Sequence, residues 1–328
     1  MTIPGTALII GARGGIGRAA AGTLLRHGWR VRGLVRGTAP GGASHPPPIE
    51  WVVGNAMDSA AVMAAARGAD AVIHAVNPPG YRHWDRLVMP MLENSIAAAQ
   101  AADARLVLPG TVYNFGPDAG CAPDEDAPQN PLTRKGGIRV AMERRLHDAA
   151  RGGLRALIVR TGDFFGPGAG NNWFSQGLLG NGRPVRALTD PGRPGVGHQW
   201  AYLPDVAETI ARLLAREEAL ERMARFHMAG HWDPDGRHMI AAIRQALGDP
   251  DMRVRRFPWW LVGLIAPAVP FCRELHEMRY LWRTGLRLGN ARLLGLLGSE
   301  PHTRLDIAVH ATLQALDAFP QEALPRHA

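Results

Sequence analysis

The chain has 328 residues, 46% of them hydrophobic and 20% charged, which predicts a globular protein with one large domain or two closely packed lobes. Its net charge of +8 comes from arginines scattered along the whole length, and the lack of a basic block disfavours a nucleic-acid-binding protein. The two cysteines are too few for a disulfide framework, and neither a signal peptide nor a membrane span is recognisable. We therefore expect a cytoplasmic protein without a membrane partner.

In the first half of the chain, short runs rich in β-branched residues alternate with Ala- and Leu-rich stretches of helical period. Strands are predicted at 6–11, 29–36, 49–53, 70–76, 105–110 and 154–160. Helices are predicted before residue 28 and at 58–68, 85–103 and 134–152. This alternation predicts an α/β fold with a doubly wound parallel sheet that carries helices on both faces.

Beyond residue 166 the pattern becomes irregular and rich in glycine, proline and tryptophan. Short strands are predicted near 184–188, 199–203 and 225–229, and helices at 204–217, 235–247, 257–268 and 303–317. We therefore divide the chain into a first domain, residues 1–165, and a smaller C-terminal lobe, residues 166–328. The lobe is expected to pack over the carboxyl edge of the sheet, where open α/β sheets bind ligands.

The segment IIGARGGIG (9–17) joins the first strand to the first helix and spaces Gly11, Gly14 and Gly17 as G-x-x-G-x-x-G. The first glycine permits a tight turn, the second lets the backbone approach a phosphate, and the third lets the helix pack on the strand. A pyrophosphate is then held by N–H groups at the helix N-terminus. The segment predicts an NAD(P)-binding Rossmann domain, with the C-terminal lobe binding the substrate. The other loop residues assigned to the cofactor are Arg13, Gly15 and Ile16.

The end of the second strand predicts which dinucleotide binds. An NAD site places an Asp or Glu there to hold the ribose 2′-hydroxyl, whereas VRGLVRG (31–37) contains no acid. Arg32 and Arg36 lie in this segment and Arg13 in the glycine loop, and guanidinium groups suit a 2′-phosphate. The alternative is that these are three more of the many arginines. We predict NADP(H) as cofactor. Two further residues assigned to its site are Asn55, at the adenine edge, and Ala75.

Together with three further motifs, these features resemble the extended and atypical short-chain dehydrogenase/reductase superfamily, including its NAD-dependent epimerases and dehydratases. The motifs are LVLPGTVYNFGP (106–117), VRTGDFFGPG (159–168) and HQWAYLPDVAETI (198–210). The resemblance places Thr111 in the catalytic Ser/Thr position and gives Asp205 a structural role. It also implies a small-molecule substrate and a homodimer through the helices at 85–103 and 134–152.

One segment departs from the superfamily pattern Tyr-x-x-x-Lys, whose tyrosine is the general acid. In TRKGGIRVAMERR (133–145) the two places are held by Lys135 and Arg139, eight and four residues before Glu143. Lys135 is the only lysine among 37 basic residues. The run KGGIRVAME resembles the isoflavone-reductase-like branch, which uses its lysine to transfer a proton. Because a buried amine can lose its proton and a guanidinium cannot, we assign Lys135 as proton donor, with Arg139 beside it in the catalytic site.

Other residues near the predicted site carry weaker signals. Tyr113 follows Thr111 by two residues and is a further candidate acid, although tyrosines at loop starts are more often packing residues. The segment 77–84 follows the fourth strand and is expected to border the nicotinamide pocket, with Tyr81 or Trp84 as a candidate substrate wall. The histidines show no spacing typical of metal ligands, so no metal site is predicted.

Three functions remain open at this stage. The first is an NADPH-dependent reductase of a small organic substrate, with Lys135 donating the proton and Thr111 orienting the substrate oxygen. The second is a nucleotide-sugar epimerase or dehydratase, which the missing tyrosine disfavours. The third is a non-catalytic protein that senses NADP(H).

Overall fold

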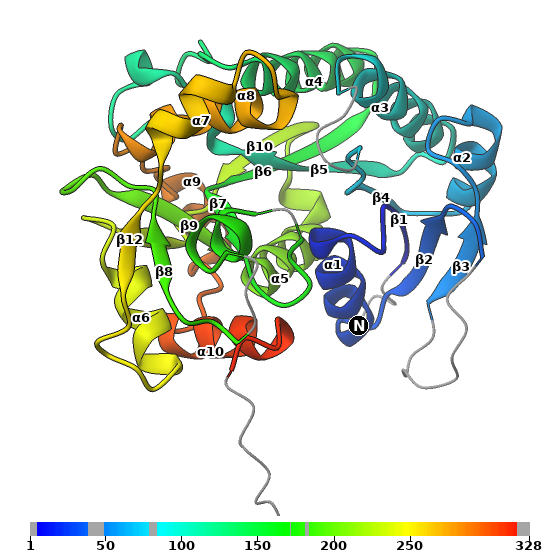
Figure 1. Cartoon of the computed structure of the whole chain (residues 1–328). Coiled ribbons are helices and arrows are strands. Elements are labelled where there is room, and N and C mark those ends of the chain that lie inside the picture. The colour runs from blue at the N-terminus through cyan, green and yellow to red at the C-terminus, as the bar shows by residue number, and fades with distance from the viewer. Residues whose placement is uncertain (1–4, 39–48, 79–83, 171, 181–183, 320–328) are drawn as a thin grey trace, which may run out of the picture.

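The computed structural model describes residues 5–38, 49–78, 84–170, 172–180 and 184–319. Its centre is a sheet of seven parallel strands in the order β10-β6-β5-β4-β1-β2-β3 (Figure 1). The strands are β1 (Thr6–Ile10), β2 (Arg30–Val35), β3 (Glu50–Val53), β4 (Ala71–His74), β5 (Arg105–Thr111), β6 (Arg155–Thr161) and β10 (Met223–His227). The order reverses between β1 and β4, which is where such sheets open a crevice for a ligand.

Helices cover both faces of this sheet. One face carries α2 (Ser59–Ala66), α3 (Trp84–Ala101) and α4 (Arg134–Arg151), and the other carries α1 (Gly15–Arg26) and α5 (Leu203–Leu214) (Figure 1). β1, TALII, is buried at every position, as expected of a central strand with helices on both sides. The predicted doubly wound parallel sheet is confirmed.

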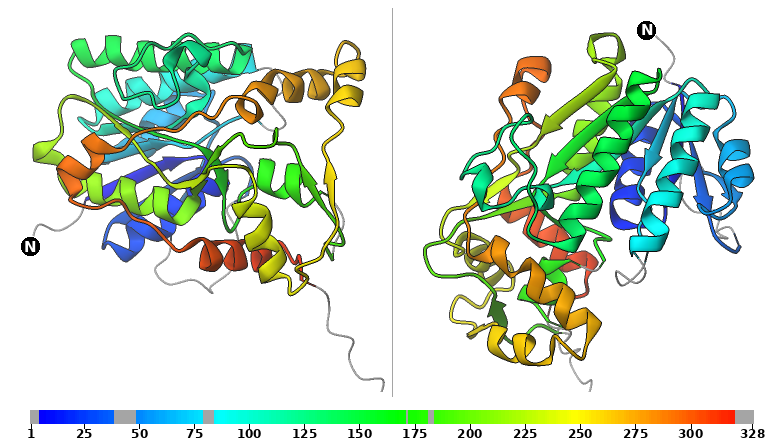
Figure 2. Two further views of the ribbon diagram at one scale, coloured as in Figure 1. Left: turned by 90° about the vertical axis from the view of Figure 1, so that its left-hand side faces the viewer. Right: turned by 90° about the horizontal axis from the view of Figure 1, so that it is seen from above.

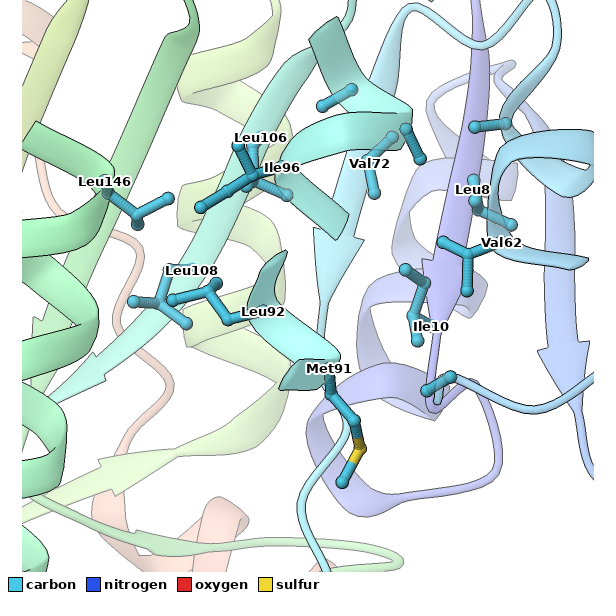
Figure 3. Packing of buried hydrophobic residues seen from close by; sticks show 14 of the residues in the cluster. Leu8, Ile10, Val62, Val72, Met91, Leu92, Ile96, Leu106, Leu108 and Leu146 are labelled. Atoms are coloured by element: carbon cyan, nitrogen blue, oxygen red, sulfur yellow. The ribbon is translucent and has the colours of Figure 1, made fainter. Parts of the chain in front are cut away.

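The core beneath α2, α3 and α4 joins helix and strand side chains that lie far apart in sequence. In Figure 3, Leu92 and Ile96 of α3 lie against Leu106 and Leu108 of β5. Leu146 of α4 completes this contact, and all five side chains are buried. Burial of this kind contributes about 1.5–3 kcal/mol per side chain and fixes α4, which carries Lys135, against the sheet.

The second half of the chain builds a smaller lobe beside the sheet (Figure 2). It contains a sheet β11-β9-β7 and a strand pair β12-β8. Its strands are β7 (Asp163–Phe165), β8 (Leu188–Asp190), β9 (His198–Tyr202), β11 (His231–Asp233) and β12 (Val254–Arg256). Its helices are α6 (His238–Ala246), α7 (Trp259–Ile265), α8 (Pro270–Glu277), α9 (Ala291–Leu297) and α10 (Leu305–Ala315).

The chain does not stay in the smaller lobe after residue 166. α5 packs against α1, and β10 forms the edge strand of the main sheet beside β6. Asp205 of α5 accepts hydrogen bonds from the backbone and hydroxyl of Thr303 at 2.8 and 2.7 Å, which ties the C-terminal segment to the sheet. The division at residue 165 stays a prediction, but one strand beyond it, β10, belongs to the seven-stranded sheet.

The helix predicted at 257–268 is present as the shorter α7, and α8 is a separate helix that begins beyond the predicted range. α7 ends at Ile265, before Pro267, and α8 starts at Pro270, the position in a helix where a missing N–H costs nothing. Across the described ranges, no helix combines the length and the hydrophobicity that crossing a bilayer requires.

Candidate active site

A cleft of about 1480 Å³ runs along the carboxyl edge of the parallel sheet. Its floor is formed by the ends of β1, β2, β4 and β5, and its far side by residues of the smaller lobe. Twelve of the thirteen residues predicted from the sequence line it. They are Gly11, Arg13, Gly14, Gly15, Ile16, Arg36, Asn55, Ala75, Thr111, Tyr113, Lys135 and Arg139.

The glycine loop leaves space for a phosphate at the N-terminus of α1. Gly11 has φ +92°, and a side chain there would collide with the backbone of Ala75, whose carbonyl lies 2.7 Å from the Cβ position. Gly14 is the N-cap of α1 in extended backbone, and a Cβ there would approach only Gly11 O, at 3.3 Å, and Ala75 O, at 3.9 Å. No side chain caps α1 and no acid occupies its first turn, so the helix N-terminus favours an anion.

Gly17 is the thirteenth of these residues, and it does not line the cleft. It is buried, and a Cβ on it would lie 2.2 Å from the carbonyl oxygen of Gly11. This matches the expected role of the third glycine, which lets the helix pack closely on the turn.

The three arginines considered for a 2′-phosphate lie in different surroundings. Arg13 and Arg36 are exposed and line the cleft. Arg32 does not line it, because its guanidinium binds Glu50 at 3.1 Å and the carbonyl of Arg67 at 3.0 Å. Arg32 therefore ties β2 to β3 and α2, and the prediction that it faces the cofactor is wrong. Of the two arginines in the segment 31–37, Arg36 alone lines the cleft.

Lys135 lies in the first turn of α4 and its side chain is only 6% exposed. Thr133 caps this helix by accepting a hydrogen bond from the Gly136 N–H at 2.9 Å, which fixes where the lysine emerges. Its Nζ forms an ion pair with Glu274 of α8 at 3.3 Å. Burial lowers the pKa of Lys135 below its ordinary value, and the charge of Glu274 opposes this shift without cancelling it.

Arg139 lies one turn after Lys135 and faces the end of β4. Its guanidinium donates to the side-chain oxygen of Asn77 at 3.4 Å and lies 5.4 Å from the ring centre of Trp84. Trp84 lines the cleft as expected, whereas Tyr81 lies outside the described residues. Arg139 thus occupies the place of the superfamily lysine and is held by a tryptophan that the usual pattern does not specify.

Thr111 and Tyr113 lie at the end of β5. The Thr111 hydroxyl accepts a hydrogen bond from the Tyr113 N–H at 3.2 Å, which orients it at the cleft. The Tyr113 hydroxyl donates to Asp163 at 2.6 Å, and the other oxygen of Asp163 lies 2.9 Å from Nε2 of His198. The Tyr113 hydroxyl proton is therefore engaged by a buried carboxylate, which disfavours Tyr113 as the proton donor to a substrate.

Two of the charged residues here were missed by sequence reasoning. Asp163 lines the cleft from just beyond β6. Its position could have been predicted from the sequence, because the carboxyl ends of parallel strands meet at the edge of the sheet where ligands bind. Glu274 gave no such signal, because its helix is short and its partner is distant in sequence. No three His, Cys, Asp or Glu side chains gather in a metal-binding arrangement within the part of the chain that the structure describes.

The sequence model of the NAD dependent epimerase/dehydratase family matches residues 7–229, which include the whole glycine loop, Lys135 and Asp205. The chain belongs to this family. The short-chain dehydrogenase/reductase resemblance is thereby confirmed, whereas the isoflavone-reductase-like character of α4 stays a prediction. No curated protein matches the sequence.

Solved structures with the same fold cover nearly the whole chain. A protein from Burkholderia cenocepacia J2315 matches with a TM-score of 0.75 at 20% identity, over 96% of this chain and 99% of that one. The dTDP-glucose 4,6-dehydratase DesIV from Streptomyces venezuelae, solved with NAD, matches at 0.71 and 19%, over 94% and 96%. The UDP-N-acetylglucosamine 4-epimerase from Bacillus cereus matches at 0.71 and 14%, over 96% and 99%. At these identities the likeness shows the fold of this family member and no more.

Gly14 and Gly17 of the loop are expected to respond differently to substitution by alanine. Gly14→Ala adds a methyl group where backbone and phosphate should approach, so NADPH affinity should fall at least about tenfold, or 1.4 kcal/mol, with little change in Tm. Gly17→Ala adds a methyl group against the carbonyl oxygen of Gly11 and should lower Tm by several degrees. Tryptophan fluorescence titration and thermal denaturation of both variants measure this contrast. Unchanged NADPH binding by Gly14→Ala would refute the placement of the pyrophosphate.

Proposed function

We propose that this protein is an NADPH-dependent reductase of a small organic substrate, with Lys135 as the proton donor. The observation that carries the proposal is the burial of the chain's only lysine in the cleft that begins at the glycine loop. The family tyrosine is absent from that helix position, and an amine with a lowered pKa is a chemically adequate replacement.

The residues of the cleft fit a dinucleotide at one end. The open Gly14 position and the uncapped N-terminus of α1 suit a pyrophosphate, and Arg36 with Arg13 suits a 2′-phosphate. Asn55, directly after β3, is fixed by the hydrogen bond that its side chain accepts from the Met57 N–H at 3.1 Å. When bound, the cofactor supplies hydride, and the protein supplies position and electrostatics.

The substrate oxygen is expected between Thr111 and Lys135. The hydroxyl of Thr111 orients it, and the ammonium of Lys135 releases a proton to it as negative charge develops. Glu274 keeps the amine charged before reaction, because its carboxylate offsets part of the desolvation. Arg139 maintains positive potential one turn further along α4, beside Asn77.

A second candidate is a nucleotide-sugar epimerase or dehydratase. Its support is the family membership together with the activities of DesIV and the Bacillus cereus epimerase. In such a reaction Lys135 would have to remove a proton first, so the neutral amine that burial favours would be the active form.

Cofactor preference is expected to depend on Arg36. Wild-type protein should bind NADPH at least about tenfold more tightly than NADH, and Arg36→Ala should remove most of that preference by weakening NADPH alone. Fluorescence titration with both nucleotides tests this, and Arg32→Ala serves as the matched control because Arg32 faces away from the cleft. Equal affinity of the wild type for both nucleotides would contradict the NADP(H) assignment.

Turnover is expected to require a titratable amine at position 135. Lys135→Arg keeps the charge but cannot donate a proton at usable pH, so kcat should fall about 10²–10⁴-fold with NADPH affinity retained. Arg134→Ala, which removes an exposed cation from the same turn, should leave kcat within about twofold of the wild type. The rate of NADPH oxidation measures both variants. Full activity of Lys135→Arg would remove Lys135 from the chemistry.

A further inference from the structure

We infer that the substrate half of the cleft takes an uncharged, largely apolar molecule with one carbonyl oxygen, and not a nucleotide diphosphate sugar. This inference deepens the proposed reductase function and rests on it for the position of the reacting carbonyl. By the substrate half we mean the part of the cleft lined by Lys135, Asp163, Trp173, Phe257, Leu275 and Met278.

The wall of the substrate half is apolar and comes from separate elements of the smaller lobe. Trp173 opens a π-helical turn, Phe257 directly precedes α7, and Leu275 and Met278 lie in and just after α8. π-helical turns are rare and often occur at functional sites. Four convergent apolar side chains present a surface that an apolar ligand body would cover.

Trp173 is held rigidly enough to act as a preformed wall. Its ring centre lies 6.0 Å from that of Phe257 and 5.2 Å from that of Trp282, in both cases edge to face. Trp282 in turn stacks on His198 at 3.7 Å with the rings nearly parallel. Because the contacts with Phe257 and Trp282 hold Trp173 within the fold, binding an apolar ring against it costs little ordering entropy.

The charge of the substrate half disfavours a diphosphate. Its one described cation, Lys135, already faces Glu274, and the buried carboxylate of Asp163 lies nearby and contributes to the potential at Lys135. A diphosphate placed here would bring two further negative charges close to the carboxylates of Glu274 and Asp163. An uncharged ligand incurs no such repulsion.

Two of the three described arginines of the cleft lie at its cofactor end, since Arg13 belongs to the glycine loop and Arg36 follows β2. The third, Arg139, lies one turn after Lys135 and donates to Asn77 just beyond β4. Cation density is therefore concentrated where the dinucleotide phosphates are expected. Thr111 and Lys135 can meet one carbonyl oxygen, and the amide side chains that also line the cleft, Asn172 and Gln176, carry no charge.

The test compares ligand classes on the full-length protein saturated with NADPH. Calorimetric titrations use a set of uncharged aryl and cyclic ketones, such as 4-phenylcyclohexanone, and separately UDP-glucose and dTDP-glucose. We expect at least one ketone to bind and both nucleotide sugars to bind at least tenfold more weakly than that ketone. Tighter binding of either nucleotide sugar, or no binding by any ketone, overturns the inference.

Variants then locate the binding site. Trp173→Ala should weaken ketone affinity at least tenfold, whereas Trp260→Ala, which truncates a tryptophan 74% exposed on α7, should not change it. Asp163→Asn, which removes the carboxylate charge, should raise the affinity for UDP-glucose. Equal ketone affinity in Trp173→Ala and Trp260→Ala overturns the placement. The wild-type comparison of ligand classes stands even where a variant does not fold.

NADPH absorbance in the same samples separates the two proposals. A ketone that binds without NADPH oxidation supports the substrate class and contradicts the reductase function. NADPH oxidation driven by a nucleotide sugar supports the reductase function and contradicts the substrate class.

Discussion

A buried ammonium needs a counter-charge, and the ion pair between Lys135 and Glu274 meets that need across the cleft. Removing an amine from water is costly, so Lys135 can remain at the start of α4 only while α8 covers it. α8 makes a second contact with the same turn, since Glu277 accepts a hydrogen bond from the backbone N–H of Arg134 at 3.1 Å. α8 therefore both packs against the first turn of α4 and supplies a charge on which the pKa of Lys135 depends.

The two ends of the cleft are built on different physical principles. At the cofactor end the backbone does the binding, because Gly11, Gly14 and Gly17 exclude side chains and leave the start of α1 open. At the substrate end side chains from distant parts of the chain converge, and they are held by pairs such as Tyr113 with Asp163. A backbone cradle of this kind is shared by many dinucleotide enzymes.

Local patterns allowed most of the first half of the chain to be predicted. Strand and helix periods placed β1 to β6 and α1 to α4 within a few residues, and glycine spacing placed the cofactor loop. Arg32 was misassigned because composition does not show on which face of a strand a side chain lies. Its orientation depends on the contact with Glu50 of the neighbouring strand, which is seen only in the folded structure. Glu274 was missed for the same kind of reason, since its partner lies far away in sequence.

The proton-donor role of Lys135 is tested by measuring its pKa. Because the chain has one lysine, biosynthetic labelling with lysine carrying carbon-13 at Cε gives a single NMR signal, whose pH titration reports that amine alone. We expect a midpoint below the ordinary lysine value in the wild type, and a still lower one in Glu274→Gln, where burial acts without the opposing carboxylate. A midpoint at the ordinary value, unchanged by Glu274→Gln, would show a solvated amine and contradict the role given to Lys135.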